Sequence, residues 1–193
     1  AGRYKSAPRS RGEGLFSWRM KVEFTTLYSE QKDLADLGDT ELPESVRDFA
    51  GIWRRLKGER PAPAKADIEP TVIPPKLLPN IMLWDVLDDD YRVRLAGTGY
   101  RRRALQELSG QHLSEVYGAN SEMREEFDAV AKRGRYSFIE QRVQWAGAEP
   151  AIRTRLLLPL SMEDGVARHL VGFIGPGFRF ELGSDGDARR RIC

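Results

Sequence analysis

The sequence predicts an α+β domain: a five-stranded antiparallel sheet with short helices on one face, preceded by an amphipathic helix. Apolar and polar residues alternate in two groups of segments, near 81–96 and 136–175, and such alternation is typical of half-buried strands. Several short helical pieces and one longer helix, 121–134, separate the two groups. A parallel sheet would need strands and helices in strict alternation, so the order favours antiparallel strands with helices on one face.

The first strand pair is predicted from the segments "IMLWDV" and "YRVRLAGT". They flank a short acidic turn, Asp88 to Asp90, which indicates a hairpin. Three further strands are predicted from "YSFIEQRVQWAG", "AIRTRLLLPL" and "ARHLVGFIG". Together these segments account for the five strands.

An amphipathic helix is predicted over residues 43–58, because its apolar residues recur at helical spacing and form one stripe. Such a stripe has to be buried, either on the helix's own sheet or against a second copy of the chain. The proline-rich connector at 59–80 is expected to hold the helix away from the domain body, which favours a homodimer. The candidates for that interface are Val46, Phe49, Ile52, Trp53 and Leu56.

Charge and composition narrow the class of protein. The chain has 193 residues and a net charge of +2. Residues 1–19 carry five basic residues and one acidic, and 187–193 carry three Arg and one Asp, so the body between them is mildly acidic, at about −4. A nucleic-acid-binding domain would need a basic face on its folded body, so nucleic acid is not expected as a partner.

Residues 1–19 are polar and without period, which predicts a disordered basic extension. The one cysteine, Cys193, excludes an internal disulfide and any Cys-based zinc site. Its scarcity fits a reducing compartment. No run of about 18 apolar residues is present and no secretion signal is visible, so we expect a cytoplasmic protein without a membrane span.

Three longer segments resemble a bacterial family of PAS-like proteins. They are "ADIEPTVIPPKLLPNIMLWDV", "YRVRLAGTGYRRRALQELSGQHL" and the late "LLLPL" followed by "VGFI". The resemblance covers roughly residues 43–176. Together with the composition and periodicity of the other segments, it gives the expected organisation: a disordered extension at 1–19, an N-terminal segment at 20–42, the amphipathic helix at 43–58, the connector at 59–80, a PAS-like domain at 81–177 and a loose C-terminal tail at 178–193.

The resemblance also implies a signalling or interaction module with no catalytic residues, which detects a small molecule or a partner protein in a cleft between sheet and helices. PAS domains commonly pair through the outer face of the sheet and the preceding helix. The candidates for the lining of the cleft are Leu95, Leu113, Phe127, Val143, Leu156 and Leu158.

Haem and a photoactive flavin are not expected as cofactors. A haem-binding PAS domain uses a His on its long helix, and residues 121–134 contain none. A photoactive flavin needs a Cys within the short helices, where Cys193 does not lie. A non-covalent flavin or another organic ligand stays open, so the sequence names no ligand.

No catalytic or metal-binding residues are predicted. The two histidines, His112 and His169, lie in no Ser-His-Asp or metal-ligand pattern. Arg101, Arg102 and Arg103 point about 100° apart on a helix, which favours a solvated face over a phosphate clamp. The expected function is therefore a non-catalytic sensory or interaction module in bacterial signal transduction. The alternatives are an adaptor that binds nothing small and, less favoured, a small-molecule enzyme on a similar cleft.

Overall fold

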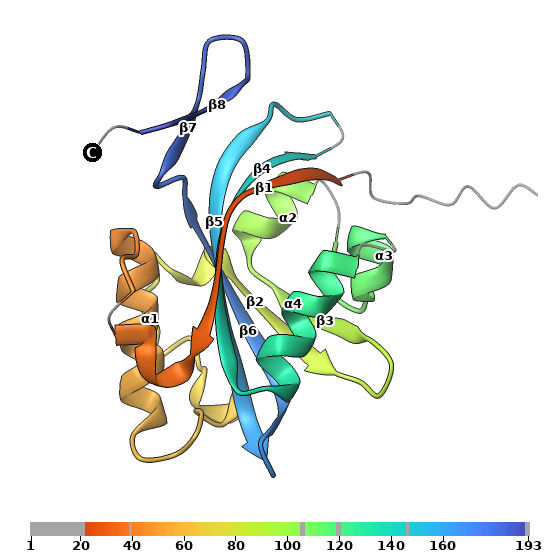
Figure 1. The fold of residues 1–193 in the computed structure, drawn as a ribbon. Coiled ribbons are helices and arrows are strands. Elements are labelled where there is room, and N and C mark those ends of the chain that lie inside the picture. The colour runs from red at the N-terminus through yellow and green to blue at the C-terminus, as the bar shows by residue number, and fades with distance from the viewer. Residues whose placement is uncertain (1–21, 39, 105–106, 119–120, 146, 192–193) are drawn as a thin grey trace, which may run out of the picture.

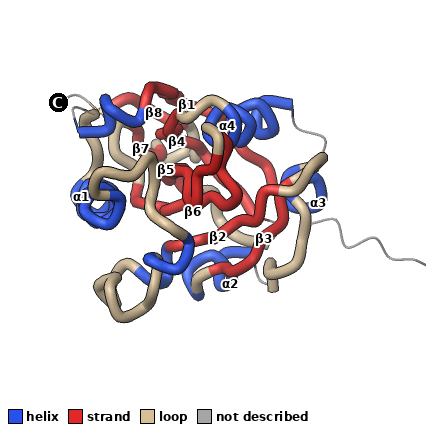
Figure 2. Tube along the Cα trace, turned by 90° about the horizontal axis from the view of Figure 1, so that it is seen from below, coloured by secondary structure: helices blue, strands red, loops and turns tan. Residues whose placement is uncertain are grey.

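A computed structural model describes residues 22–191, apart from 39, 105, 106, 119, 120 and 146. Its centre is a six-stranded antiparallel sheet in the order β1-β4-β5-β6-β2-β3. Helix α1 packs on one face, here called the outer face, and α2, α3 and α4 lie on the other, the inner face (Figure 1). The view from below also places α1 and α4 on opposite sides of the sheet (Figure 2). The predicted α+β class is confirmed, with six strands in place of five.

The additional strand comes from the segment 20–42, for which the sequence predicted no element. The six strands are β1 (Val22–Asp33), β2 (Ile81–Val86), β3 (Tyr91–Ala96), β4 (Arg135–Trp145), β5 (Ala151–Glu163) and β6 (Val166–Pro176). β1 pairs with β4 along its length, and a bulge interrupts the register between Thr26 and Tyr28. A strand is identified in a sequence by the two-residue alternation of its apolar and polar side chains. A bulge interrupts that alternation, so β1 could not be predicted from it.

The apolar stripe of α1 (Glu44–Lys57) is buried against its own sheet. Phe49 stacks on Phe173 of β6 with ring centroids 4.8 Å apart, and the Trp53 indole donates a hydrogen bond to the Pro159 carbonyl of β5 at 3.0 Å. Val46, Phe49, Ile52 and Trp53 are buried and Leu56 is partly buried in the same cluster. The homodimer interface expected on this stripe is therefore wrong, because one chain already covers it.

The connector at 59–80 does not hold α1 away from the domain. It folds back over the outer face, where Ala62, Ile73 and Leu77 are buried. The Ser161 amide of β5 donates to the Pro63 carbonyl at 2.8 Å. Proline limits helix and central strand but does not prevent packing. Three short 3₁₀ turns complete this layer: η1 (Leu34–Gly38), η2 (Lys65–Asp67) and η3 (Leu78–Asn80).

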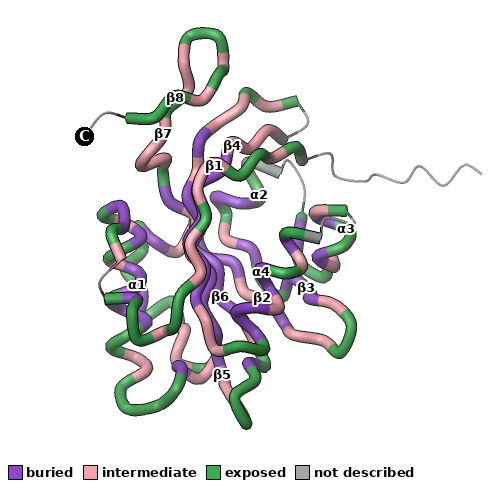
Figure 3. Tube along the Cα trace, viewed as in Figure 1, coloured by how far each residue is buried: buried purple, intermediate pink, exposed green. Residues whose placement is uncertain are grey.

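The inner face carries the second half of the core, beneath α2 (Thr98–Ala104), α3 (Leu113–Tyr117) and α4 (Ser121–Lys132). Phe127 of α4 meets the rings of Trp84 and Tyr91 edge-on, with centroids 5.0 Å away in both pairs. Figure 3 shows the buried positions gathered along the strands between α1 and α4. Both faces of the sheet are thus covered.

The segment 178–193 was expected to be a loose tail, and its described part contains a hairpin of β7 (Phe180–Leu182) and β8 (Ala188–Arg190). The hairpin projects beyond the end of the main sheet (Figure 1). The extension predicted at 1–19 lies outside the described residues.

Candidate functional site

A buried ion pair joins the inner face of the sheet to α4. An Arg155 Nη2 donor from β5 bonds Glu126 Oε2 on α4, and the two residues are 8% and 5% exposed. The guanidinium lies 5.8 Å from the ring centre of Tyr117 and 5.7 Å from that of Phe127. Burial by itself lowers the pKa of Arg155, but the charge and hydrogen bond of Glu126, together with the nearby Tyr117 and Tyr100, outweigh burial and raise it. Arg155 therefore stays charged inside the fold.

Two polar atoms of this pair lack a hydrogen-bond partner among the described residues: Glu126 Oε1 and Arg155 Nε. A buried polar atom left without a partner costs about 1–3 kcal/mol. Such a cost in a core is often associated with function. The pair is therefore the centre of the candidate site.

A pocket of about 240 Å³ adjoins Glu126, between β1, β4 and the N-terminal half of α4. β1 forms one wall of the pocket because it extends the sheet beyond α4. Gln141 on β4 donates to the Thr26 hydroxyl at 3.2 Å across the floor of the pocket. The lining residues are Phe24, Thr26, Ser29, Gln31, Glu122, Met123, Glu125, Glu126, Ile139 and Gln141.

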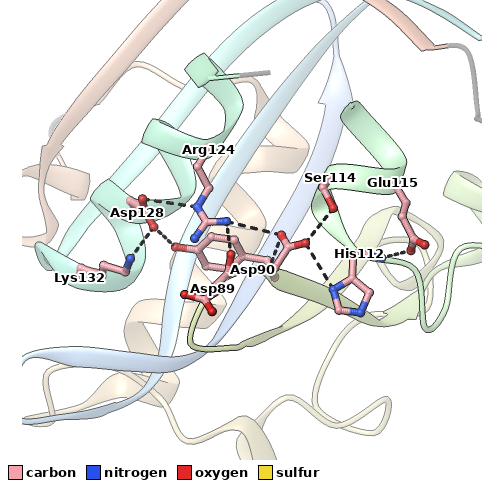
Figure 4. Close-up of polar contacts among 9 residues, drawn as sticks. Asp89, Asp90, His112, Ser114, Glu115, Arg124, Asp128 and Lys132 are labelled. Atoms are coloured by element: carbon pink, nitrogen blue, oxygen red, sulfur yellow. Dashed lines mark hydrogen bonds and ion pairs between the residues drawn. The ribbon is translucent and has the colours of Figure 1, made fainter. Parts of the chain in front are cut away.

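A polar network holds α3 and α4 against the acidic β2–β3 turn (Figure 4). The Ser114 hydroxyl donates to Asp90 Oδ2 at 2.9 Å, and His112 Nδ1 lies 3.3 Å from the same oxygen. From α4, Arg124 donates to the Asp89 carbonyl at 2.6 Å. The turn that the sequence indicated only as a hairpin loop thus anchors two helices.

The same network reaches the core through Tyr91. Its hydroxyl donates to Asp128 Oδ1 at 2.5 Å, and Lys132 lies 2.9 Å from that carboxylate (Figure 4). Burial, and then the Asp128 carboxylate, raise the pKa of Tyr91 well above its ordinary value, so the phenol remains a donor. α4 is therefore tied to the sheet edge at Asp128 and to the sheet centre at Glu126.

The predicted cleft residues divide between the two faces. Leu113 and Phe127 are buried on the inner face, and Val143 pairs with Phe24, which lines the pocket. Leu156 and Leu158, however, face α1 on the outer side.

Leu95 is 48% exposed at the sheet edge. The predicted inner-face placement of Leu156 and Leu158 is wrong, because β5 is buried on both faces and Leu157 is the residue that faces inward. The unbroken apolar run "LLLPL" was the sequence signal for a strand buried on both faces. Glu126 and Arg155 were missed, since a charged residue in an alternating pattern is normally assigned to solvent.

His169 lies on β6 beside Asp85 of β2, with Nδ1 3.0 Å from Asp85 Oδ1. Burial opposes ionisation of Asp85, but the hydrogen bond from Arg92 and the charges of Arg94 and His169 outweigh it and lower the pKa of Asp85. Burial lowers the pKa of His169, and Asp85 offsets part of this effect. Among the described residues, no group of three or more His, Cys, Asp or Glu side chains could hold a metal ion.

The fold and this site define an α+β module in which a helical layer closes over one face of an antiparallel sheet and a further helix seals the other. The family model for the PAS domain matches residues 42–175, so the chain belongs to the PAS domain family. β1, the wall of the pocket, precedes the matched residues. No curated protein matches the chain. None of the helices in the described part of the chain is long and apolar enough to cross a membrane.

Proposed function

We propose that the chain is a non-catalytic sensory and interaction module of signal transduction, which passes the state of its inner face to a partner protein. Membership of the PAS domain family supports a sensory or signalling role. The observation that carries the proposal is the buried Glu126–Arg155 pair between α4 and the sheet. A homodimer through the α1 stripe is not part of it, because that stripe is buried in one chain.

The buried Glu126–Arg155 pair is a poor source of stability. Replacing a buried ion pair with apolar residues is often neutral or stabilising, whereas removing one partner costs about 3–5 kcal/mol. Stability alone therefore does not explain the pair. The pair joins α4 to the sheet and Glu126 also lines the pocket, so a ligand that interacts differently with the paired and the displaced arrangement would shift the position of α4.

A displacement of α4 would reach the surface through residues on the same helix. Arg124 contacts the β2–β3 turn, and Asp128 holds Tyr91 of β3. The β2–β3 turn also holds α3, through the hydrogen bond from Ser114 to Asp90. The inner-face helices and this turn are the surface that we expect a partner to read.

The test removes the pair without leaving a buried charge. The double variant Glu126→Leu with Arg155→Met should fold with a thermal stability close to that of the natural chain. Crosslinking in cells followed by mass spectrometry should show that it loses the partner, or loses the dependence of that partner on growth conditions. The matched control is Glu163→Leu with Arg168→Met, which removes an exposed pair with side chains 63% and 62% exposed.

A folded double variant with the same partners under all conditions contradicts sensing through this pair and favours an adaptor that binds nothing small. Turnover of a substrate by the purified chain would contradict the non-catalytic part of the proposal.

A further inference from the structure

We propose that the pocket between β1, β4 and α4 binds a small organic amine, whose ammonium group pairs with Glu126. This inference names a ligand class for the sensory module and in that respect rests on the proposed function. Three independent features of the pocket support it: an unpartnered buried carboxylate oxygen, an acidic lining, and a small apolar wall.

The carboxylate oxygen is the first feature. Glu126 lines the pocket, is 5% exposed, and uses Oε2 to hold Arg155. Its second oxygen, Oε1, accepts no hydrogen bond among the described residues. Oε1 is itself buried, so an ammonium group in the pocket reaches it after the Glu126 side chain turns toward the pocket. The three N–H donors of that group can then supply the bond that Oε1 lacks.

The charge of the lining is the second feature. Of the ten described lining residues, Glu122, Glu125 and Glu126 are acidic and none is basic. The ion pair with Arg155 offsets the charge of Glu126, so Glu122 and Glu125 leave the mouth of the pocket negative. A concave site lined with one sign of charge concentrates ligands of the opposite sign.

Size and apolar surface are the third feature. Phe24, Met123 and Ile139 supply the apolar part of the lining. The volume of about 240 Å³ lies below the range of about 300–1,000 Å³ typical of drug-sized ligands. It exceeds the roughly 150 Å³ that suffices for benzene in an engineered cavity. A ligand with one short apolar or aromatic body and one amine fits these limits.

The site depends on β1, which supplies Phe24, Thr26, Ser29 and Gln31. This strand lies outside the residues matched by the family model. The proposed specificity is thus a property of this chain's own extension of the sheet.

The experiment titrates the full chain with 2-phenylethylamine and, separately, with 2-phenylethanol, which has the same ring but no charge. Isothermal calorimetry measures the affinity, and amide chemical shifts locate the site. We expect saturable amine binding, with shifts in β1 and α4. The alcohol should bind at least roughly tenfold more weakly, because it lacks a charge-assisted hydrogen bond.

Two variants test the site itself. Glu126→Gln should weaken amine binding by roughly tenfold or more. Because that change also leaves Arg155 buried beside a neutral group, Ser29→Phe serves as a second variant: Ser29 is exposed on β1 and lines the pocket, so the ring fills it without touching the ion pair. Glu163→Gln, which removes an exposed carboxylate outside the lining, should bind the amine like the natural chain.

Several outcomes would overturn the proposal: no saturable binding of the amine, equal affinity for amine and alcohol, or undiminished binding by folded Ser29→Phe. The proposal would also be overturned if a water molecule occupied the position beside Oε1 and the amine did not bind there. The two proposals can fail separately. If the chain binds the amine but the double variant Glu126→Leu with Arg155→Met keeps the same partners, the binding site is supported and the proposed function is contradicted.

Discussion

The carboxylate of Glu140 on β4 accepts a hydrogen bond from the backbone amide of Arg179 at 2.8 Å, inside the protein. Its other oxygen accepts from the amides of Phe178 and Phe180 at 2.7 Å and 3.0 Å. The side chain of Glu140 is fully buried. Three consecutive amides therefore surround one carboxylate and attach the chain that leads into β7 to the main sheet.

Glu140→Gln should loosen this attachment. The side-chain NH₂ of glutamine would face N–H donors, and hydrogen bonds to a charged group contribute about 1.5–3 kcal/mol. We expect a loss of stability of about that size and faster hydrogen exchange at amides 178–180. Glu181→Gln on β7, where Glu181 is exposed, is the matched control. Unchanged exchange at 178–180 in folded Glu140→Gln would show that other contacts hold the segment.

Trp53→Ala should destabilise the chain by about 3–5 kcal/mol, because the indole is 1% exposed and bonds the Pro159 carbonyl. The stripe is buried within one chain, so the melting temperature of natural chain and variant should not depend on protein concentration. Thermal melts over a hundredfold range of concentration measure this. Trp53→Phe, which keeps most of the side-chain volume, should lose less stability than Trp53→Ala. A melting temperature that rises with concentration only for the natural chain would restore the dimer interpretation of this helix.

Gly175→Ala should weaken the contact between α1 and β6. A Cβ at this position would lie 2.5 Å from Val46 Cγ2 and 2.6 Å from Thr154 Oγ1. Overpacking of this kind costs about 1–3 kcal/mol. Gly51→Ala on α1 is the control, since its added Cβ would meet no atom within 4 Å apart from its chain neighbours and the backbone of its own helix. It should stabilise the helix by about 0.5–1 kcal/mol. Chemical denaturation measures both, and equal effects would contradict the tight contact at Gly175.

Alkaline pH should destabilise the fold through Tyr136. Burial raises the pKa of Tyr136 to about 12; the Thr40 hydroxyl opposes this shift and Glu30 adds to it. A tyrosine in the unfolded chain ionises at about pH 10. Between these values the unfolded state releases a proton that the native state keeps, so stability falls as pH rises through this window.

Tyrosine absorbance at 295 nm and melts from about pH 9 to pH 12 check this prediction. Tyr136→Phe should show a shallower fall of melting temperature with pH than the natural chain. Tyr28→Phe is an informative comparison, because burial also raises the pKa of Tyr28. Identical slopes for the natural chain and Tyr136→Phe would contradict a native-state pKa near 12.

The sequence by itself determined the elements whose pattern is local. In α1 and α4 the apolar residues recur at helical spacing, and in β2 and β3 they alternate with polar residues as in a strand. The order of those elements and three longer segments indicated the PAS family, and the family match bears this out. The periodicity of a helix or strand depends only on its own residues, so these elements could be predicted without knowing the tertiary structure.

Only the tertiary structure decided what each apolar face packs against. Periodicity shows that Phe49 and Trp53 share a side of α1, but it cannot say whether a sheet or a second copy covers them. In β5 both sides are apolar, so the choice between Leu156 and Leu157 for the inner face depended on where the helices lie.

The candidate site depended on tertiary structure even more strongly. Glu126 and Arg155 are 29 residues apart, and each by itself reads as an exposed charge. β1, which completes the pocket, was hidden by a bulge in its alternation. A charge is retained in a core only when a partner from another element meets it there, and that meeting is a property of the folded chain.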